Sequence, residues 1–215
     1  MQLVDRIERI VKETLEADSS GHDWYHINRV VLNAKQIQAL EGGNPLIVEI
    51  AALLHDISDH KLNGGILNDG GRVSKEILLK EGATEAFAAQ VAQIVDSVSF
   101  KGAEVLDKVD SLEAKIVQDA DRLDAIGAIG IARAFAYGGA KGQAMYDPEL
   151  DPTLHSSFED YVNSKTTSIN HFHEKLLLLK DRLHTAAAKK IGQERHDFML
   201  AFLKQFDREW NSTFE

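Results

Sequence analysis

Proline is rare in this chain, and its scarcity limits the folds that the chain can adopt. Only three of the 215 residues are proline, which interrupts the hydrogen bonding of a helix interior and clashes with the preceding turn. In most of the remaining sequence, apolar residues recur every three or four positions, the spacing of one face of an α-helix. Strand-like alternation of apolar and polar residues is nearly absent. The sequence therefore predicts an all-α fold.

The length and composition indicate one globular domain. Hydrophobic residues make up 44% of the chain and charged residues 27%, a balance that allows a sizeable buried core. No linker or internal repeat divides the sequence, so we expect residues 1–215 to form a single domain. The first residues lack the apolar run of a signal peptide, and no segment has the length of a transmembrane helix. We therefore expect a cytoplasmic location and no membrane partner.

The charge and the absence of cysteine exclude some classes of partner and ligand. A formal net charge of -10 argues against binding a nucleic-acid polymer, because such binding needs many Lys and Arg contacts to phosphates. A small phosphorylated substrate is compatible with this charge, since a bound cation and a few basic side chains can reverse the field inside one pocket. Because the chain has no cysteine, any metal site must use nitrogen and oxygen ligands.

Apolar periodicity and capping residues place the expected helices along the chain. Asn44 and Pro45 form a strong start signal, and the helix expected at 45–57 is apolar nearly all round, which predicts that it is buried. Asp23 is expected to cap the helix that follows it. The expected helices cover residues 3–17, 24–40, 45–57, 72–80, 84–98, 112–137 and 186–210, and one more starts near Ser156.

His55 and Asp56 stand out at the end of the apolar helix. A carboxylate there is costly to bury unless a positive partner compensates its charge, and a metal ion is one such partner. The alternative is an exposed helix end at Asp56 beside a hydrogen-bonded core histidine. His26 and Asp121 lie on two other expected helices, so two imidazoles and two carboxylates could converge between helices, as ligands do in metal-binding bundles.

The order of these four residues resembles the H…HD…D signature of the HD-domain superfamily of metal-dependent phosphohydrolases. Residues 21–30 (GHDWYHINRV), 51–56 (AALLHD) and 121–125 (DRLDA) resemble its metal-binding segments. Residues 171–177 and 198–210 resemble a small bacterial branch that is similar to nucleoside triphosphate pyrophosphohydrolases. The resemblance implies an HD-domain helical bundle with a metal core near residues 20–137 and additional C-terminal helices near residues 138–215.

The same resemblance implies a metal centre on His26, His55, Asp56 and Asp121. Two-metal members of the superfamily carry extra histidines between the His-Asp pair and the final Asp, and His60 is the only histidine in that interval. We therefore expect one divalent metal ion. The mixed nitrogen and oxygen ligands suit Fe²⁺, Co²⁺, Ni²⁺, Zn²⁺ or Mg²⁺ as well as Mn²⁺, which is the ion we expect.

Residues near these ligands in the sequence are candidates for catalysis and substrate binding. The resemblance implies that Asp59 is the general base or acid, with His60 as its competitor, and a solvated loop carboxylate is the alternative for Asp59. A phosphorylated substrate also needs cationic partners, although each basic candidate could instead belong to a salt bridge. The candidates for substrate binding are Lys61, Arg122, Asp124, Arg133 and Lys175.

The expected activity is hydrolysis of nucleoside or deoxynucleoside triphosphates to monophosphate and pyrophosphate by water activated on the metal. Two alternatives stay open. One is a nucleotidase or cyclic-nucleotide phosphodiesterase, which would release different products. The other is a nucleotide-sensing module that keeps the metal without turnover, and the presence of all four ligand residues argues against it.

Overall fold

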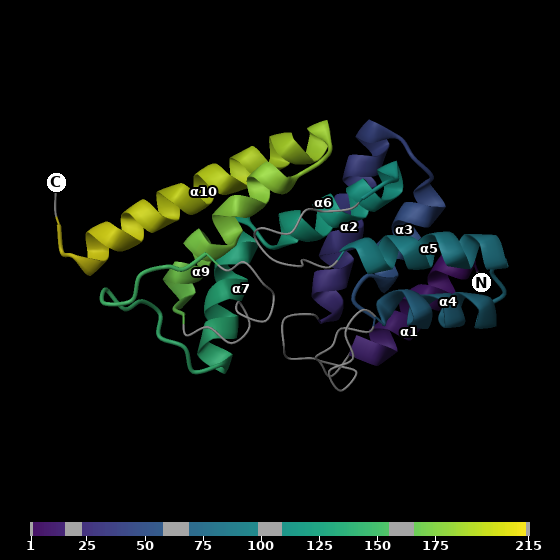
Figure 1. Ribbon diagram of the computed structural model, residues 1–215, viewed down its shortest axis with the longest axis horizontal. Helices are drawn as coiled ribbons and strands as arrows, with labels where there is room; N and C mark the ends of the chain where they lie inside the picture. The colour runs from purple at the N-terminus through teal and green to yellow at the C-terminus, as the bar shows by residue number, and fades with distance from the viewer. Residues whose placement is uncertain (1, 16–22, 58–68, 99–108, 155–165, 214–215) are drawn as a thin grey trace. The chain divides into compact units, whose positions relative to one another are not determined.

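The described part of the chain is helical throughout. The computed structural model describes residues 2–15, 23–57, 69–98, 109–154 and 166–213, and within them it contains helices and no strand. Figure 1 shows this arrangement, and the prediction of an all-α fold is confirmed. Among the helices of these ranges, none is both long enough and apolar enough to cross a membrane.

The described residues divide into two compact units, a first unit that ends at Asp121 and a second unit that begins at Arg122. The boundary falls inside one helix, α6 (Leu112–Asp124). Each unit has its own buried apolar residues, such as Ile50 in the first and Phe172 in the second. The expectation that the chain forms a single domain stays a prediction.

The first unit is built around α3 (Pro45–Leu54), which packs against α1 (Leu3–Leu15), α2 (Trp24–Glu41) and α5 (Glu85–Val98). Seven of its ten residues are buried, which confirms that the helix with apolar residues nearly all round is a core helix. Helices α4 and α5 pack against each other and lie side by side in Figure 1. The other helices of this unit are α1 (Leu3–Leu15), α2 (Trp24–Glu41), α4 (Gly70–Lys80), α5 (Glu85–Val98) and the part of α6 up to Asp121.

Two capping side chains set the starts of the helices that matter most for the site. The Asp23 carboxylate accepts a hydrogen bond from the His26 backbone N–H at 2.9 Å, so Asp23 is the cap of α2, as predicted. The Asn44 side chain accepts from the first N–H groups of α3, and Pro45 occupies the first helical position, also as predicted.

Helix α3 ends three residues earlier than predicted. It stops at Leu54, and the Ile57 N–H donates to the Leu54 carbonyl at 3.1 Å, which closes a tighter turn with an i to i+3 bond. His55 and Asp56 therefore lie in this turn and not on the helix proper. The apolar pattern continues to Ile57 without a visible change, because Ile57 is itself buried.

The second unit contains the end of α6 and four further elements: α7 (Gly127–Ala140), α9 (Ser168–Glu174), the 3₁₀-helix η1 (Leu176–Arg182) and α10 (Ala186–Trp210). Helix α10 packs on α7 and η1, and α9 packs on the same two elements. The Phe172 ring stacks on Phe202 at 5.8 Å and contacts Phe135 at 6.2 Å. The predicted bounds of α10 are confirmed, whereas the helix expected near Ser156 lies outside the described residues.

The prediction of one helix over residues 112–137 is wrong. The helix stops at Asp124, Ile126 is extended (φ −124°, ψ 167°), and a new helix starts at Gly127. Gly127 has φ +77°, a conformation that side-chain-bearing residues rarely adopt. The apolar spacing hides this break, because Leu123 and Ile126 are buried on either side of the turn. Arg133 consequently lies on α7 and not on the helix of Asp121.

Candidate metal centre

His55 is held in one tautomer by the turn that follows α3. Its side chain is buried, and Nδ1 lies 2.9 Å from the Ala52 carbonyl oxygen. A carbonyl only accepts hydrogen bonds, so Nδ1 carries the proton and Nε2 presents its lone pair. This is the orientation in which a histidine binds a metal ion, because the second nitrogen is fixed by an outer partner.

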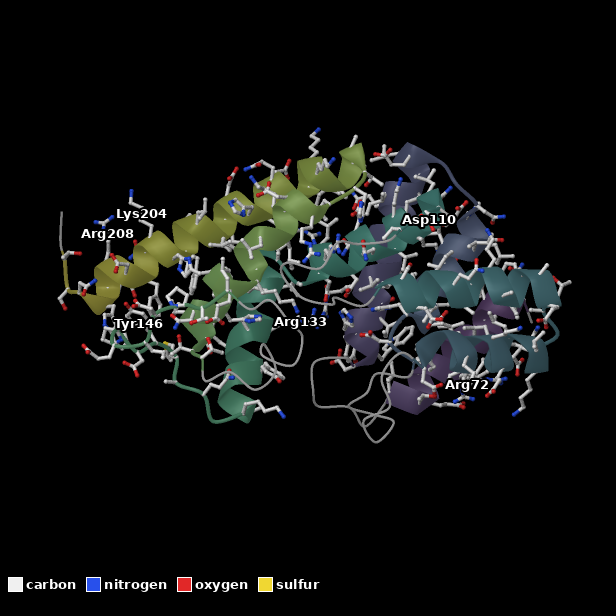
Figure 2. The ribbon with its side chains drawn as sticks, in the orientation of Figure 1. Arg72, Asp110, Arg133, Tyr146, Lys204 and Arg208 are labelled. Atoms are coloured by element: carbon white, nitrogen blue, oxygen red, sulfur yellow. The ribbon has the colours of Figure 1, made fainter. Side chains whose placement is uncertain are left out.

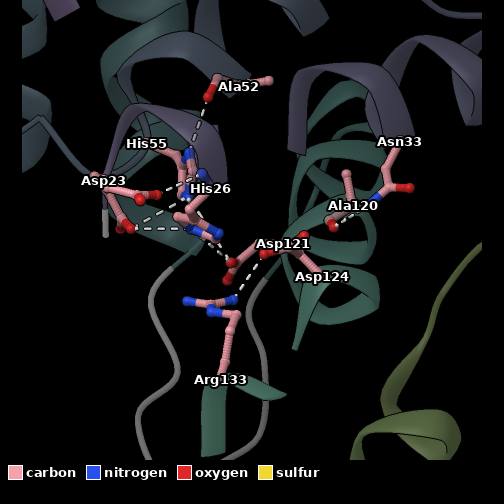
Figure 3. Close-up of polar contacts among 10 residues, drawn as sticks. Asp23, His26, Asn33, Ala52, His55, Ala120, Asp121, Asp124 and Arg133 are labelled. Carbon is pink, nitrogen blue, oxygen red and sulfur yellow. Dashed lines mark hydrogen bonds and ion pairs between the residues drawn. The ribbon is translucent and has the colours of Figure 1, made fainter. Parts of the chain in front are cut away.

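His26 faces His55 from the first turn of α2. Its side chain is 1% exposed, and its Nε2 lies 3.3 Å from Nε2 of His55, with the two rings at an angle of 66°. Figure 3 shows the two rings together, with Asp23 to their left and the Ala52 carbonyl above them. Two nitrogen lone pairs repel at this distance unless a proton or a cation lies between them. The pair is therefore suited to a shared positive ion.

Two carboxylates complete the cluster. Oδ2 of Asp56 lies 3.3 Å from Nε2 of His26 and 3.4 Å from Nε2 of His55. Oδ1 of Asp121, from α6, lies 3.6 Å and 3.8 Å from the same two nitrogens. Asp121 is the more exposed of the two acids, with 31% of its side chain accessible against 18% for Asp56. The open side of the cluster therefore lies next to Asp121.

The spacings among His26, His55 and Asp56 fit a single divalent ion. Ligand atoms about 2.1 Å from a tetrahedral ion lie about 3.4 Å from one another, close to the separations found here. His26, His55 and Asp56 each offer one ligand atom, and those atoms lie within 4.8 Å of one another. Burial of both imidazoles removes competing water and strengthens their interaction with a cation. The cluster can therefore hold a metal on nitrogen and oxygen ligands.

Two side-chain amide contacts attach the part of α6 up to Asp121 to the rest of the first unit. The Asn33 side chain on α2 donates to the Ala120 carbonyl at 3.3 Å, one residue before Asp121. The Gln118 side chain, fully buried, donates to the Ser97 carbonyl at 2.9 Å. Both contacts were missed in the sequence. The available signal was a polar residue on an otherwise apolar face, since Asn33 follows His26 by two helical turns.

Two substrate-binding candidates of the second unit, Arg122 and Asp124, are buried and have polar partners. Asp124 is 2% exposed, and its Oδ2 accepts from Nη1 of Arg133 at 2.7 Å (Figure 3). Arg122 is buried, donates from Nη1 to the Arg182 carbonyl, and lies 3.3 Å from Nε2 of His184.

Lys175 is half-buried where α9 ends. Burial, aided by the positive charge of Lys175, lowers the pKa of His171 to about 3. Three further candidates, Asp59, His60 and Lys61, lie outside the described residues. Their predicted roles stay predictions, as do those of Arg122 and Lys175.

Comparison with known proteins identifies the family to which the chain is similar. A model of the HD domain matches residues 23–126, a span that includes all four predicted ligands. The chain is 38% identical to YpgQ of Bacillus subtilis over 210 residues, which cover 97% of this chain and 94% of YpgQ.

Solved structures match over nearly the whole chain. The crystal structure of an HD-superfamily hydrolase from Bacillus thuringiensis is 43% identical, with TM-score 0.76, and covers 98% of this chain and 97% of that one. The crystal structure of a protein from Lactobacillus plantarum is 35% identical, with TM-score 0.85, and covers 98% of this chain and 97% of that one. The crystal structure of Bacillus subtilis YpgQ in complex with ADP is 37% identical, with TM-score 0.76, covering 96% of this chain and 97% of that one.

Proposed function

The chain belongs to the HD-domain superfamily and is a metal-dependent phosphohydrolase, and within that class we propose that it hydrolyses nucleoside or deoxynucleoside triphosphates to monophosphate and pyrophosphate. The observation that carries the proposal is the convergence of two carboxylate oxygens on the paired nitrogens of His26 and His55 at 3.3–3.8 Å. Two further points support a nucleotide substrate. YpgQ has been crystallised with ADP, and the C-terminal segments resemble the pyrophosphohydrolase branch.

We propose His26, His55, Asp56 and Asp121 as the ligands of one ion, with Mn²⁺ favoured. When bound, a divalent ion supplies Lewis acidity toward a phosphoryl oxygen and lowers the pKa of water. The protein keeps His55 in the tautomer that leaves Nε2 available, through the bond between Nδ1–H and the Ala52 carbonyl. The carboxylates offset part of the charge of the ion, and the exposed side at Asp121 is where a substrate can approach.

Arg133 is our proposed contact for the substrate phosphates. A phosphoryl-transfer reaction needs a cation to stabilise charge that develops on the phosphoryl oxygens. The buried Asp124 carboxylate orients the guanidinium of Arg133 by accepting from Nη1 at 2.7 Å. An arginine fixed in this way loses little conformational entropy when it binds a phosphate. Asp59 or His60 is proposed to transfer the proton.

A product-resolved nucleotide panel tests the proposed reaction. The metal-replete protein is incubated with nucleoside and deoxynucleoside triphosphates and Mn²⁺, and the products are separated by chromatography. We expect monophosphate and pyrophosphate in equal amounts. Orthophosphate with free nucleoside would instead identify a nucleotidase, and conversion of cyclic nucleotides alone would identify a phosphodiesterase.

A matched pair of histidine variants tests the metal site. His55→Ala removes a buried proposed ligand, whereas His173→Ala changes an exposed histidine of α9. We expect the first variant to lose bound metal and activity together and the second to keep both. Metal retained by the wild-type protein without hydrolysis of any nucleotide would favour the sensing module.

A further inference from the structure

Arg195 of α10 reaches the end of the helix that carries Asp121 and Asp124. Its Nη1 donates a hydrogen bond to the carbonyl of Leu123, in the last turn of α6. The last carbonyls of a helix have no partner within the helix, and a cation at that end also interacts favourably with the helix dipole. Arg195 thus caps α6 from a helix about seventy residues farther along the chain.

The stem of Arg195 also packs on the break between α6 and α7. A Cβ atom added at Gly127 would lie 3.0 Å from Cβ and from Cγ of Arg195. Gly127 has φ +77°, so both its backbone conformation and the space beside it favour glycine. The head group of Arg195 holds one side of the break through Leu123, and its stem covers the other side.

Asp124 links Arg195 electrostatically to Arg133. Burial lowers the pKa of Arg195, and the negative charge of Asp124 opposes that shift, so the two groups interact. The same carboxylate, 2% exposed, accepts from Arg133 at 2.7 Å. The negative charge of this buried carboxylate therefore acts on both guanidinium groups, through a hydrogen bond with Arg133 and through its charge alone with Arg195 as far as the described contacts go. Without Arg195, its charge would act on Arg133 alone.

We propose that Arg195 is a positioning residue for the phosphate-binding arginine. It caps α6, fixes the turn at Gly127 and shares the charge of Asp124, and through these contacts it holds the Arg133 guanidinium ready for a substrate phosphate. The inference rests on the proposed function in taking Arg133 as the phosphate contact. Loss of Arg195 should draw Arg133 more tightly onto Asp124 and weaken phosphate binding.

Direct binding of inorganic pyrophosphate tests this role without turnover. Pyrophosphate is titrated into the Mn²⁺-loaded protein by calorimetry, with the heat of mixing into Mn²⁺ buffer subtracted. We expect Arg195→Met to weaken binding about tenfold, the effect of losing one bond to a charged group, and Arg195→Lys to recover most of it. The matched control is Lys204→Met, an exposed cation on the same helix (Figure 2), which should bind as the wild type does.

The route through Asp124 is tested by a double-mutant cycle. In an Asp124→Asn background, Arg195→Met should weaken pyrophosphate binding by clearly less than the tenfold expected in the wild type, because the charge of Asp124 is already gone and only the contacts with Leu123 and Gly127 are lost. Equal effects in both backgrounds would overturn the proposal. In steady-state assays with a substrate that the wild type hydrolyses, Arg195→Met should raise KM about tenfold and leave kcat within about twofold.

If the Arg195→Met protein does not fold, Arg195→Gln is used in its place. Glutamine keeps a donor for the Leu123 carbonyl but carries no charge. Unchanged pyrophosphate affinity in a folded Arg195→Met or Arg195→Gln protein contradicts the proposal, and so does a wild type that binds no pyrophosphate. If the wild type hydrolyses no triphosphate but still binds pyrophosphate, the proposed substrate is rejected while the titrations still decide the role of Arg195.

Discussion

The Nε2 atoms of His26 and His55 lie 3.3 Å apart although His26 lies on α2, His55 lies in the turn after α3, and 28 other residues separate them in the chain. Each side chain is 1% exposed, and facing lone pairs in such a buried position repel each other unless a proton or a cation lies between them. The folded protein therefore holds two proposed metal ligands close together in a buried position. A divalent ion bound between the two nitrogens would remove that repulsion, so we expect metal binding to stabilise the folded protein.

Metal removal should lower the thermal stability of the protein. A ligand that binds only the folded state at about 100 times its Kd adds about 2.7 kcal/mol, equivalent to a Tm shift of about 5–10 °C for a chain of this size. We expect that shift when chelator replaces Mn²⁺ in a thermal melt. In His55→Ala the two melts should coincide, and a persisting difference in that variant would place the stabilising ion elsewhere.

Asn33→Ala should weaken both the first unit and its metal affinity. The substitution removes the hydrogen bond to the Ala120 carbonyl, worth about 1 kcal/mol, and loosens the helix that carries Asp121. Denaturant unfolding and metal titration measure the two effects. Gln36→Ala, at an exposed position on the same helix, is the control and should change neither. Full metal affinity in Asn33→Ala would show that α6 is held sufficiently by its other contacts.

Gly127→Ala should destabilise the protein by about 1–3 kcal/mol, because the new side chain must adopt φ +77° beside Arg195. The matched control is Gly139→Ala on α7, where an added Cβ meets nothing within 4 Å. Alanine there should be neutral or stabilising by up to about 1 kcal/mol. Unfolding in urea measures both. Equal free energies for the two variants would count against strain at the α6–α7 break.

Protonation of His171 should destabilise the protein in mildly acidic solution. Its pKa falls from 6.5 to about 3 on folding, so below pH 6.5 the unfolded chain binds a proton that the folded protein does not. The loss begins near pH 6.5 and grows down to the folded value. Between pH 6.5 and 5 it should reach about 1–2 kcal/mol, since one pKa unit corresponds to about 1.4 kcal/mol.

His171→Gln isolates this contribution, because it cannot titrate. The difference in unfolding free energy between wild type and variant should shrink as the pH falls from 7 to 5. The exposed His173→Gln serves as the control, whose difference from wild type should stay constant over the same range. A constant difference for His171→Gln as well would mean that this imidazole protonates in the folded state.

Local sequence signals were sufficient for most helices and for their starts. Asp23, Asn44 and Thr185 cap α2, α3 and α10 because a short polar side chain can satisfy the first N–H groups of the helix beside it. Helix ends were harder to predict. The turn after Leu54 and the break at Gly127 both lie within uninterrupted apolar patterns, since burial continues through them.

The sequence by itself determined the helical class, the exclusion of thiolate ligands and the identity of the four proposed ligand residues. These follow from residue types, their spacing and the resemblance that their order carries. Only the tertiary structure decided that the paired nitrogens of His26 and His55 meet, that Asn33 holds α6 near them, and that Arg195 closes the α6–α7 junction. The reason is physical: periodicity reports which face of a helix is buried, whereas distances between side chains depend on how separate helices pack.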